Sequence, residues 1–337
     1  MKKYLLLSTV VFASIFFLSH TPSAQAVTVS PLRLELSASP GDTVSAQFKL
    51  YNEENKTNVY YFSTANFDAK DESGQPQFTT DTQGLASWVQ RPTNLTLQPK
   101  SYQVVDFSIT VPRDAEPGGY FSAVLASTLA PETGESQSVS LANQVGVLLL
   151  FRVNGDVAEG ADVLEFDTAK KQHFFTALPV QFYYRFQNGG DVWLKPLGDI
   201  IISNIFGSTT KIIKANSTGG DVLPKSIRRF QAAWLESGGN IEQDPLLITS
   251  PISPKGFWAT VNYQWKNFVF GRYTANLNLV YGTDVKQGIT KKIAFWVFPW
   301  QLLLVEIISF ILVSGIFLAL AIWIVVSFLK RRKRLNK

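Results

Sequence analysis

Few side chains in this sequence could carry out covalent or metal chemistry. The 337 residues contain no cysteine, and Met1 is the only methionine. Of the two histidines, His20 lies in an N-terminal segment that we expect to be removed, which leaves His173 as the only imidazole of the mature chain. This composition excludes thiol nucleophiles, disulfides, zinc sites of cysteine and histidine, and catalytic machinery that needs more than one imidazole. We expect His173 to be a solvated surface residue, and we predict no metal site and no cofactor.

Carboxyl groups remain as candidate catalysts, because a glycosidase needs only two of them at a suitable separation. The predicted loops 66–88 and 235–270 carry such groups: Asp68, Asp71 and Glu72 in the first, and Glu236, Glu242 and Asp244 in the second. Ordinary solvated loop charges explain the same residues, and no spacing typical of a calcium-binding EF-hand is present. We therefore predict that the protein is not an enzyme, with a carboxylate-based glycosidase of wall glycan as the less favoured alternative.

The loop 235–270 also holds a cluster of aromatic residues. Loops of this length are often functional. The rings are those of Phe257, Trp258, Tyr263, Trp265 and Phe268. They could contact a sugar or a protein, and we name Trp258, Tyr263 and Trp265 as candidate partner-binding residues. The alternative is that the rings form an extra hairpin packed on the fold or on a nearby membrane.

A predicted targeting segment at the N-terminus precedes the part of the chain that would position these side chains. Residues 1–26 have the features of a signal peptide, with Lys2 and Lys3 as a basic start and an apolar run after them. The sequence Ala24-Gln25-Ala26 is typical of a cleavage site. We expect the mature chain to begin near Val27.

The C-terminus carries a predicted membrane anchor. Residues 300–329 predict one transmembrane helix, because 307–329 are 23 residues without a charge. That stretch makes about 34 Å of helix, enough for a hydrocarbon core of ~30 Å. The basic tail 330–337 follows at once and indicates a cytoplasmic C-terminus. We therefore expect a single-pass protein of the cell membrane with its N-terminal body outside.

Charge outside the two ends is nearly balanced. The whole chain has a formal net charge of +5, but residues 27–299 carry 23 basic and 25 acidic residues, a net charge of −2. The net positive charge of the chain therefore comes from the predicted signal peptide and the basic tail, and we exclude nucleic-acid binding as its explanation. An exported body without any disulfide favours a bacterial origin.

Strand patterns dominate the region between the ends. Apolar and polar residues alternate in 44–50 and 105–111, and again in 180–186 and 273–281. Turn sequences rich in Gly, Pro, Asn and Asp separate such segments at intervals typical of sandwiches, and no convincing amphipathic helix precedes the membrane segment. The fold class is therefore predicted as all-β, with tandem immunoglobulin-like β-sandwiches followed by a single transmembrane helix.

An internal repeat indicates that there are two sandwiches. Leu97-Gln98-Pro99-Lys100-Ser101 in the first half matches Val222-Leu223-Pro224-Lys225-Ser226 in the second. Each half also has an alternating strand that runs into a turn containing asparagine, at 48–52 and at 184–188. We infer two copies of one unit, 27–157 and 158–298.

The same motifs resemble the WxL-interacting protein family of Gram-positive bacterial surfaces, over nearly the whole chain. In the first unit the residues similar to that family's peptidoglycan-binding domain are Pro31-Leu32-Arg33-Leu34, Pro99-Lys100-Ser101, Pro117-Gly118-Gly119-Tyr120 and 143–151. In the second unit those similar to its membrane-proximal domain are Asn188-Gly189-Gly190, Pro196-Leu197-Gly198, Leu223-Pro224-Lys225-Ser226 and Gly271-Arg272-Tyr273. The resemblance implies a membrane-anchored protein that faces the cell wall and holds peptidoglycan, secreted surface proteins, or both, and it implies no reaction.

Sheet edges supply a physical route to such binding, because their unpaired backbone groups can accept a strand from a partner. The sequence thus predicts a membrane-anchored extracellular binding or scaffold protein. A mechanical stalk, or a chaperone-like presenter of secreted proteins, has the same sequence features and stays open as the alternative.

Overall fold

The computed structural model describes residues 27–130, 144–235, 254–283 and 286–335. The predicted signal peptide, 1–26, lies outside them. The chain divides into two compact units. Of the described residues, 27–68, 78–130 and 144–156 belong to the first unit, and 69–77 together with those after residue 156 belong to the second.

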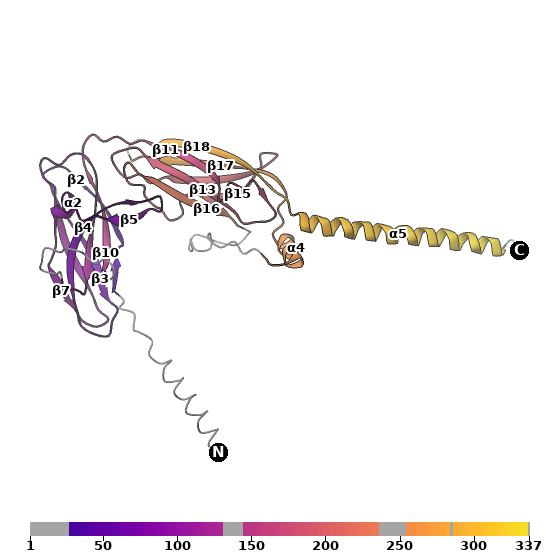
Figure 1. Ribbon diagram of the computed structural model, residues 1–337, viewed down its shortest axis with the longest axis horizontal. Coiled ribbons are helices and arrows are strands. Elements are labelled where there is room, and N and C mark those ends of the chain that lie inside the picture. The colour runs from indigo at the N-terminus through magenta and orange to yellow at the C-terminus, as the bar shows by residue number, and fades with distance from the viewer. Residues whose placement is uncertain (1–26, 131–143, 236–253, 284–285, 336–337) are drawn as a thin grey trace, which may run out of the picture. The chain divides into compact units, whose positions relative to one another are not determined.

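The first unit is built of two β-sheets (Figure 1). One sheet has the order β1 (Val27–Ser30), β3 (Thr43–Asn52), β8 (Tyr102–Thr110) and β6 (Val89–Gln90). The other has the order β2 (Arg33–Ala38), β10 (Gln144–Val153), β9 (Gly118–Ser127), β4 (Asn58–Lys70) and β5 (Gln75–Phe78), with β7 (Asn94–Leu97) paired to β4. The end of β4 and most of β5 fall in residues 69–77, which are grouped with the second unit. A single turn of helix, α2 (Leu85–Trp88), precedes β6.

Alternation along the strands builds the core between these sheets. Phe48 and Leu50 of β3 are buried, as are Phe107 and Ile109 of β8, which confirms the predicted inward faces. Phe48 packs edge-on against Phe62 of the opposite sheet with ring centroids 6.2 Å apart. Burial of each such side chain stabilises the fold by about 1.5–3 kcal/mol.

The segment 66–88 is not the long loop that we expected. β4 continues to Lys70, β5 returns beside it, and α2 follows. Phe67 of β4 is buried, with its ring 5.9 Å from that of Phe121 and 6.0 Å from that of Phe78 in β5. The side chain of Asn66 ties the returning chain down, since its amide donates to the Asp81 carbonyl (3.0 Å) and its oxygen accepts from the Ala86 N–H (3.0 Å).

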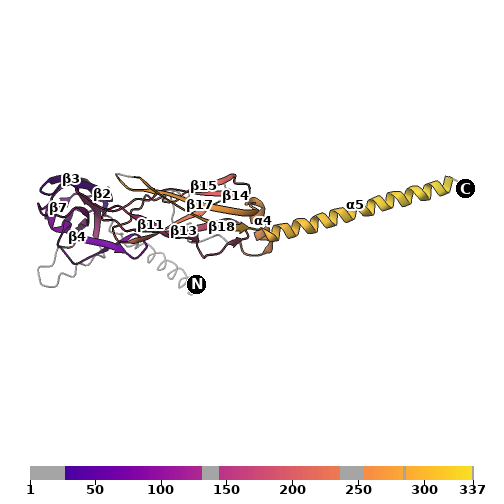
Figure 2. The ribbon, with the colours of Figure 1, turned by 90° about the horizontal axis from the view of Figure 1, so that it is seen from above.

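The second unit is also made of two sheets, seen from two sides in Figures 1 and 2. The three-stranded sheet has the order β11 (Ala161–Thr168), β13 (Val180–Asn188) and β16 (Ile227–Trp234). The five-stranded sheet has the order β12 (Phe174–Phe175), β18 (Gln287–Val297), β17 (Gly271–Tyr281), β14 (Leu197–Asn204) and β15 (Thr209–Lys214). The rings of Phe182 in β13 and Phe295 in β18 meet across the core with centroids 5.5 Å apart.

The internal repeat is confirmed at one corner of each sandwich. In the first unit the buried Asn52 amide donates to the Lys56 carbonyl (2.8 Å) and to the Gln98 carbonyl (3.0 Å). The Asn52 N–H donates to the Ser101 carbonyl (2.8 Å), and the Ser101 hydroxyl donates to Gln98. Lys100 has a φ of 53°, the left-handed conformation that lets the chain turn between these bonds.

The second unit repeats this corner with the corresponding residues. The buried Asn188 amide donates to the carbonyls of Val192 (2.8 Å) and Val222 (2.9 Å), and the Asn188 N–H donates to Ser226 (2.9 Å). Lys225 has a φ of 54°. The asparagine turn and the Pro-Lys-Ser segment, each a weak sequence match alone, therefore form the same corner in both units. In this corner a buried amide satisfies backbone carbonyls that would otherwise be unpaired.

One predicted feature of the second unit is wrong. Residues 257–266 are neither part of a loop nor part of the extra hairpin that we gave as the alternative, because Phe257–Lys266 form the helix α4. The helix was hidden from sequence patterning because its inward face is partly polar. Val261 and Gln264 are its buried residues, while the large apolar rings face outward.

A second helix, α5 (Trp300–Leu335), ends the chain. Its part Trp300–Ser327 is long and apolar enough to cross a membrane by length and composition. The helical conformation continues through most of the predicted basic tail, 330–337, to Leu335. Both views place α4 beside the first turns of α5 (Figures 1 and 2).

Candidate partner-binding surfaces

Strand β8 of the first unit is paired very unequally on its two sides. On one side every residue from Tyr102 to Thr110 has a partner in β3. On the other side β6 pairs only with Ile109 and Ser108. Within the described part of the chain, residues 102–107 of β8 therefore have no neighbouring strand on that side.

The direction of the backbone groups follows from the ends of the β3–β8 ladder. Val111 donates its N–H to the Asp42 carbonyl (2.9 Å), and Asn52 donates to the Ser101 carbonyl (2.8 Å). In an antiparallel ladder hydrogen-bonded pairs alternate with non-hydrogen-bonded ones, so the odd-numbered residues of β8 bond to β3. The even-numbered residues Tyr102, Val104 and Asp106 therefore direct their N–H and C=O groups to the open side. We call this stretch, 102–106, the β8 edge.

A proline explains why β6 stops where it does. Gln90 faces Ser108, an even-numbered residue of β8, so the next hydrogen-bonded position of β6 would be residue 92, opposite Asp106. Residue 92 is proline and has no N–H to donate. The ladder consequently ends after two residues and leaves the β8 edge open.

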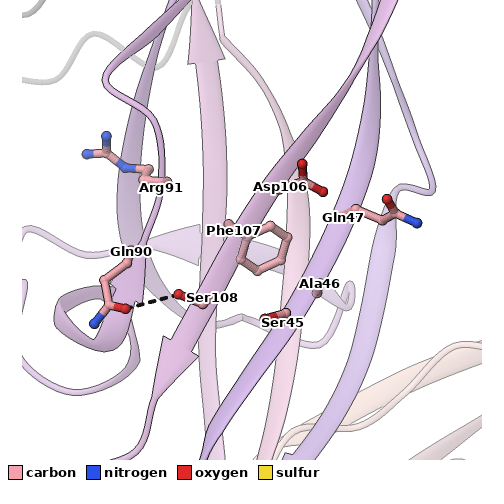
Figure 3. Close-up of a pocket in the computed structure, with 8 residues that line it drawn as sticks. All are labelled: Ser45, Ala46, Gln47, Gln90, Arg91, Asp106, Phe107 and Ser108. Atoms are coloured by element: carbon pink, nitrogen blue, oxygen red, sulfur yellow. Dashed lines mark hydrogen bonds between the residues drawn. The ribbon is translucent and has the colours of Figure 1, made fainter.

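A shallow hollow of about 720 Å³ lies at this point (Figure 3). Its polar side chains are those of Ser45, Gln47, Gln90, Arg91, Asp106 and Ser108. Gln90 is fixed in place, because its side-chain oxygen accepts from the Ser108 hydroxyl (3.0 Å) and its amide donates to Thr110 Oγ1 (3.2 Å). Burial lowers the pKa of the Arg91 guanidinium. The hollow thus offers donors and acceptors beside the backbone groups of the β8 edge.

The outward side chains of the β8 edge are partly apolar. Tyr102 is 57% exposed, and its ring lies against that of Tyr51 with centroids 5.2 Å apart. Lys49 Nζ lies 5.4 Å from the centre of the same Tyr102 ring. Val104, two residues along, is 38% exposed. An added strand would find a small apolar and aromatic surface next to its hydrogen-bonding groups.

The three candidate binding residues of the aromatic segment are divided by the structure. Trp258 is 70% exposed and Trp265 is 63% exposed, and both lie on the outer face of α4. Tyr263 points inward, since its hydroxyl donates to the Leu178 carbonyl at 2.9 Å. Their role in binding a partner stays a prediction, and Tyr263 has a structural contact of its own.

The candidate catalytic carboxylates are occupied by local contacts. Asp71 accepts from the Ser73 N–H, and this bond holds the pKa of the Asp71 carboxyl below its ordinary value. Arg185 Nε donates to Glu72 at 2.9 Å and likewise lowers the Glu72 pKa. Asp68 is exposed. Lowered pKa values favour the ionised form, whereas the general acid of a glycosidase needs a raised one. Glu236, Glu242 and Asp244 lie outside the described residues.

The one histidine of the predicted mature chain lies at the surface of the second unit. His173 Nδ1 is 3.1 Å from the Ala294 carbonyl oxygen, and Nε2 is 3.6 Å from Asp167 Oδ1. The histidine side chain is 44% exposed. No group of three potential metal ligands was found in the residues that the structure describes.

No protein-family model matches the sequence, and no curated protein matches it either. Solved structures do match. The class 5 fimbriae chaperone CfaA is 11% identical with a TM-score of 0.37, covering 79% of this chain and 98% of its own. A chain from the Salmonella enterica SafA pilin in complex with the SafB chaperone is 10% identical with a TM-score of 0.36, covering 81% of this chain and 99% of its own. A PapD-like domain of human CEP192 is 17% identical with a TM-score of 0.27, covering 41% and 91%. These likenesses concern the immunoglobulin-like fold alone.

Proposed function

We propose that this protein is a membrane-anchored extracellular binding protein whose first sandwich binds an extended segment of a secreted or cell-surface protein. The segment adds as a strand to the β8 edge. The observation that carries this proposal is the outward direction of the backbone groups of Tyr102, Val104 and Asp106, without a strand beside them in the described chain.

Strand addition suits this edge in length and chemistry. Residues 102–106 extend over about 13 Å at ~3.3 Å per residue, enough to pair with a short extended peptide. Main-chain hydrogen bonds supply affinity without regard to sequence, and contacts with outward side chains supply selectivity. Tyr102 and Val104 offer such contacts on the outer face.

Anchorage is the second part of the proposal. The apolar stretch of α5 supports a single membrane span. The basic residues that follow it support a cytoplasmic C-terminus, and the N-terminal signal supports export of the two sandwiches. On this topology the β8 edge faces the cell exterior.

Membership of the WxL-interacting protein family is part of the same proposal. Three of the motifs that carry the resemblance come together in one sheet of the first unit. In it, β10 pairs with β2 at Leu148 and Arg33, and with β9 at Phe151 and Tyr120. This arrangement, in which β2, β10 and β9 are neighbours in one sheet, supports the resemblance better than scattered matches would. It does not distinguish a scaffold that keeps its partner from a chaperone-like presenter that releases it.

Peptidoglycan is a second candidate ligand, favoured by one observation. The hollow beside the β8 edge is lined by amide, hydroxyl, carboxylate and guanidinium groups, which can hydrogen-bond to glycan hydroxyls and peptide stems. A wall fragment would occupy this hollow through side chains, whereas a protein strand would occupy the edge through backbone groups.

A pair of proline variants tests strand addition at the β8 edge. Val104→Pro removes an N–H that faces the open side and costs no bond to β3. Ile212→Pro is the matched control on β15, because the Ala215 N–H donates to Gly198 (3.0 Å) and the ladder register then turns the Ile212 N–H outward. Both positions hold exposed β-branched residues at free edges.

The measurement is retention of partners on the immobilised full-length protein in detergent micelles, with surface-protein extract and purified bacterial wall supplied separately. We expect a saturable protein partner that is lost with Val104→Pro and kept with Ile212→Pro. Equal retention by both variants would contradict strand addition at β8. Retention of wall alone, lost with Asp106→Ala and unchanged by Val104→Pro, would favour peptidoglycan in the hollow.

A further inference from the structure

Helix α4 is joined to the beginning of α5 by a buried glutamine. Gln264 Oε1 accepts from the Leu302 N–H at 2.9 Å, and Gln264 Nε2 donates to Gln301 Oε1 at 2.6 Å. Gln264 is fully buried and Leu302 almost so. Because a buried amide without these partners would be costly, the pair of bonds fixes α4 against the first turn of α5.

The other face of α4 is apolar and exposed. Trp258, Asn262 and Trp265 are spaced by four and three residues, so they lie on one side of the helix. Further exposed rings surround the junction of α4, β17, β18 and α5: Phe257, Phe268, Phe270, Phe298 and Trp300. Phe270 and Phe298 are in contact, with centroids 5.7 Å apart. Such a patch on a soluble surface would be exceptional, because large exposed apolar patches mark interaction sites.

Charge on this segment has one sign. Residues 254–270 contain two charged side chains, Lys255 and Lys266, and no acidic residue. Aromatic rings combined with lysine are the composition of helices that lie in a membrane interface, where indole rings sit at headgroup level and ammonium groups meet phosphate.

The position at which α4 contacts α5 agrees with a location of α4 in the membrane interface. Leu302, which α4 contacts, lies five residues before Ile307, where the charge-free stretch begins. Five residues of helix rise about 7.5 Å at ~1.5 Å per residue. The headgroup layer on each side of a bilayer is about 5–8 Å thick. When the charge-free stretch fills the hydrocarbon core, α4 therefore lies at headgroup depth.

We propose that α4 is an interfacial helix that rests on the phospholipid surface, with Trp258 and Trp265 inserted among the headgroups and Lys255 and Lys266 near their phosphates. This inference rests on the proposed membrane anchorage by α5. The bilayer is the occupant of the aromatic face, rather than a sugar, a protein partner or a second copy of the chain. The inward face is already bonded to the second unit through Gln264 and Tyr263.

The chain has no cysteine, so single probes can be placed without background labelling. Asn262→Cys puts an environment-sensitive fluorophore between the two tryptophans and keeps both of them. Thr210→Cys on β15 gives an exposed position on the sandwich, and Leu318→Cys gives one inside the apolar stretch. Each full-length variant is reconstituted in phosphatidylethanolamine–phosphatidylglycerol vesicles that contain a nitroxide either at the headgroup or near the end of the acyl chain.

We expect the Asn262 probe to be quenched most by headgroup nitroxide, the Leu318 probe most by chain-end nitroxide, and the Thr210 probe by neither. If the Leu318 probe is quenched and the Asn262 probe behaves like the Thr210 probe, the interfacial helix is refuted while the anchor stands. An Asn262 probe that is shielded from water but unquenched by lipid means that a protein covers the face, which also overturns the proposal. An unquenched Leu318 probe removes the anchor and the inference with it.

A double variant separates lipid contact from mere proximity. Trp258→Glu with Trp265→Glu places two acids on the exposed face, where neither original ring has a role in the core. We expect the Asn262 probe to lose several-fold of its headgroup quenching in this background, with the Leu318 signal and the thermal unfolding of the sandwiches unchanged. Unaltered quenching at Asn262 would contradict insertion of the tryptophans.

Discussion

The first sandwich leaves the β8 edge open between apolar side chains, whereas the second leaves β15 open between lysines. On the β8 edge the outward-bonding residues are Tyr102, Val104 and Asp106. On β15 they include Ile212 and Lys214, and Lys214 is exposed. Lysine on an edge strand opposes pairing with another chain, since the approaching strand would have to desolvate the charge. These two free edges, one in each unit, thus differ in how strongly they discourage pairing with another chain.

A third edge, that of strand β16 in the second unit, is partly covered. The Arg229 N–H of β16 donates to the Glu72 carbonyl at 2.8 Å, and residues 69–77 belong to this unit. Arg185 binds the Glu72 side chain from the neighbouring strand. Of these three edges, only the one on β8 has neither a lysine nor a covering segment in the described chain. This difference is why we assign partner binding to the first unit.

Proline substitutions should distinguish the two sides of β8 by the largest change in stability that we predict. Val105→Pro removes an N–H that bonds to β3, leaves its acceptor unsatisfied and disturbs a buried side chain, so we expect a loss of about 3 kcal/mol or more in the free energy of unfolding. Val104→Pro, one residue away, removes only a solvent-facing N–H and is expected to cost less than about 1 kcal/mol. Denaturant unfolding of the two variants measures both values.

The neighbouring pair acts as its own control, because both residues are valine. Val105 also loses buried apolar contacts on substitution, so Val105→Ala is measured to subtract that part. If Val104→Pro proves the more damaging of the two prolines, the backbone directions of the β8 edge are reversed and the binding proposal loses its basis.

The next effect tests whether the two corners are equivalent. Asn52→Ala and Asn188→Ala each remove a buried amide that satisfies backbone carbonyls. An unsatisfied buried polar group costs about 1–3 kcal/mol, so we expect each variant to destabilise its own unit by about 2–4 kcal/mol. Thermal unfolding, followed by a tryptophan signal and by circular dichroism, reports the change.

Asn262→Ala, at an exposed position of α4, is the matched control and should change stability by less than about 0.5 kcal/mol. A loss at one corner without a comparable loss at the other would show that the repeat of sequence is not a repeat of energetic role.

Much of the fold was accessible from the sequence because it depends on local alternation. Strands β3, β8, β13 and β17 follow the predicted inward patterns, and the Pro-Lys-Ser repeat correctly marks two equivalent corners. The errors have one cause. In β4–β5 and in α4 the contacts that define the element are made by polar side chains, Asn66 and Gln264, whose inward direction no hydrophobicity pattern records.

The β8 edge was predictable only as a class of site. The sequence indicates that sheet edges exist, and Pro92 is a visible signal that a strand must end. Which strand it leaves exposed depends on the pairing of Gln90 with Ser108, a contact across 18 residues that the alternation does not specify. The aromatic residues of α4 were found from composition, but their division between an exposed face and Tyr263 required the helix.

The two corners also differ at one position, where the second corner has an aspartate that pairs with Lys225. Asp191 lies three residues after Asn188, where the first corner has Asn55 after Asn52. Asp191 binds Lys225 at 3.0 Å and accepts from the Ala158 N–H at 3.1 Å, and these bonds, that to Lys225 first, hold the pKa of the Asp191 carboxyl below its ordinary value.

A carboxyl with a lowered folded-state pKa stabilises the fold above its unfolded-state pKa of about 3.9, and this contribution is lost as the pH falls through the folded-state value. Asp191→Asn should therefore lower the melting temperature slightly at pH 7, and the difference from the parent protein should disappear as the pH falls through the folded-state pKa of Asp191. Asn55→Ala, the matched change in the first corner, should show no pH-dependent difference. Because the Asp191–Lys225 pair is exposed, added salt should also reduce the difference in melting temperature between Asp191→Asn and the parent protein. A difference that persists in acid would mean that the shape of the Asp191 side chain, rather than its charge, stabilises the corner.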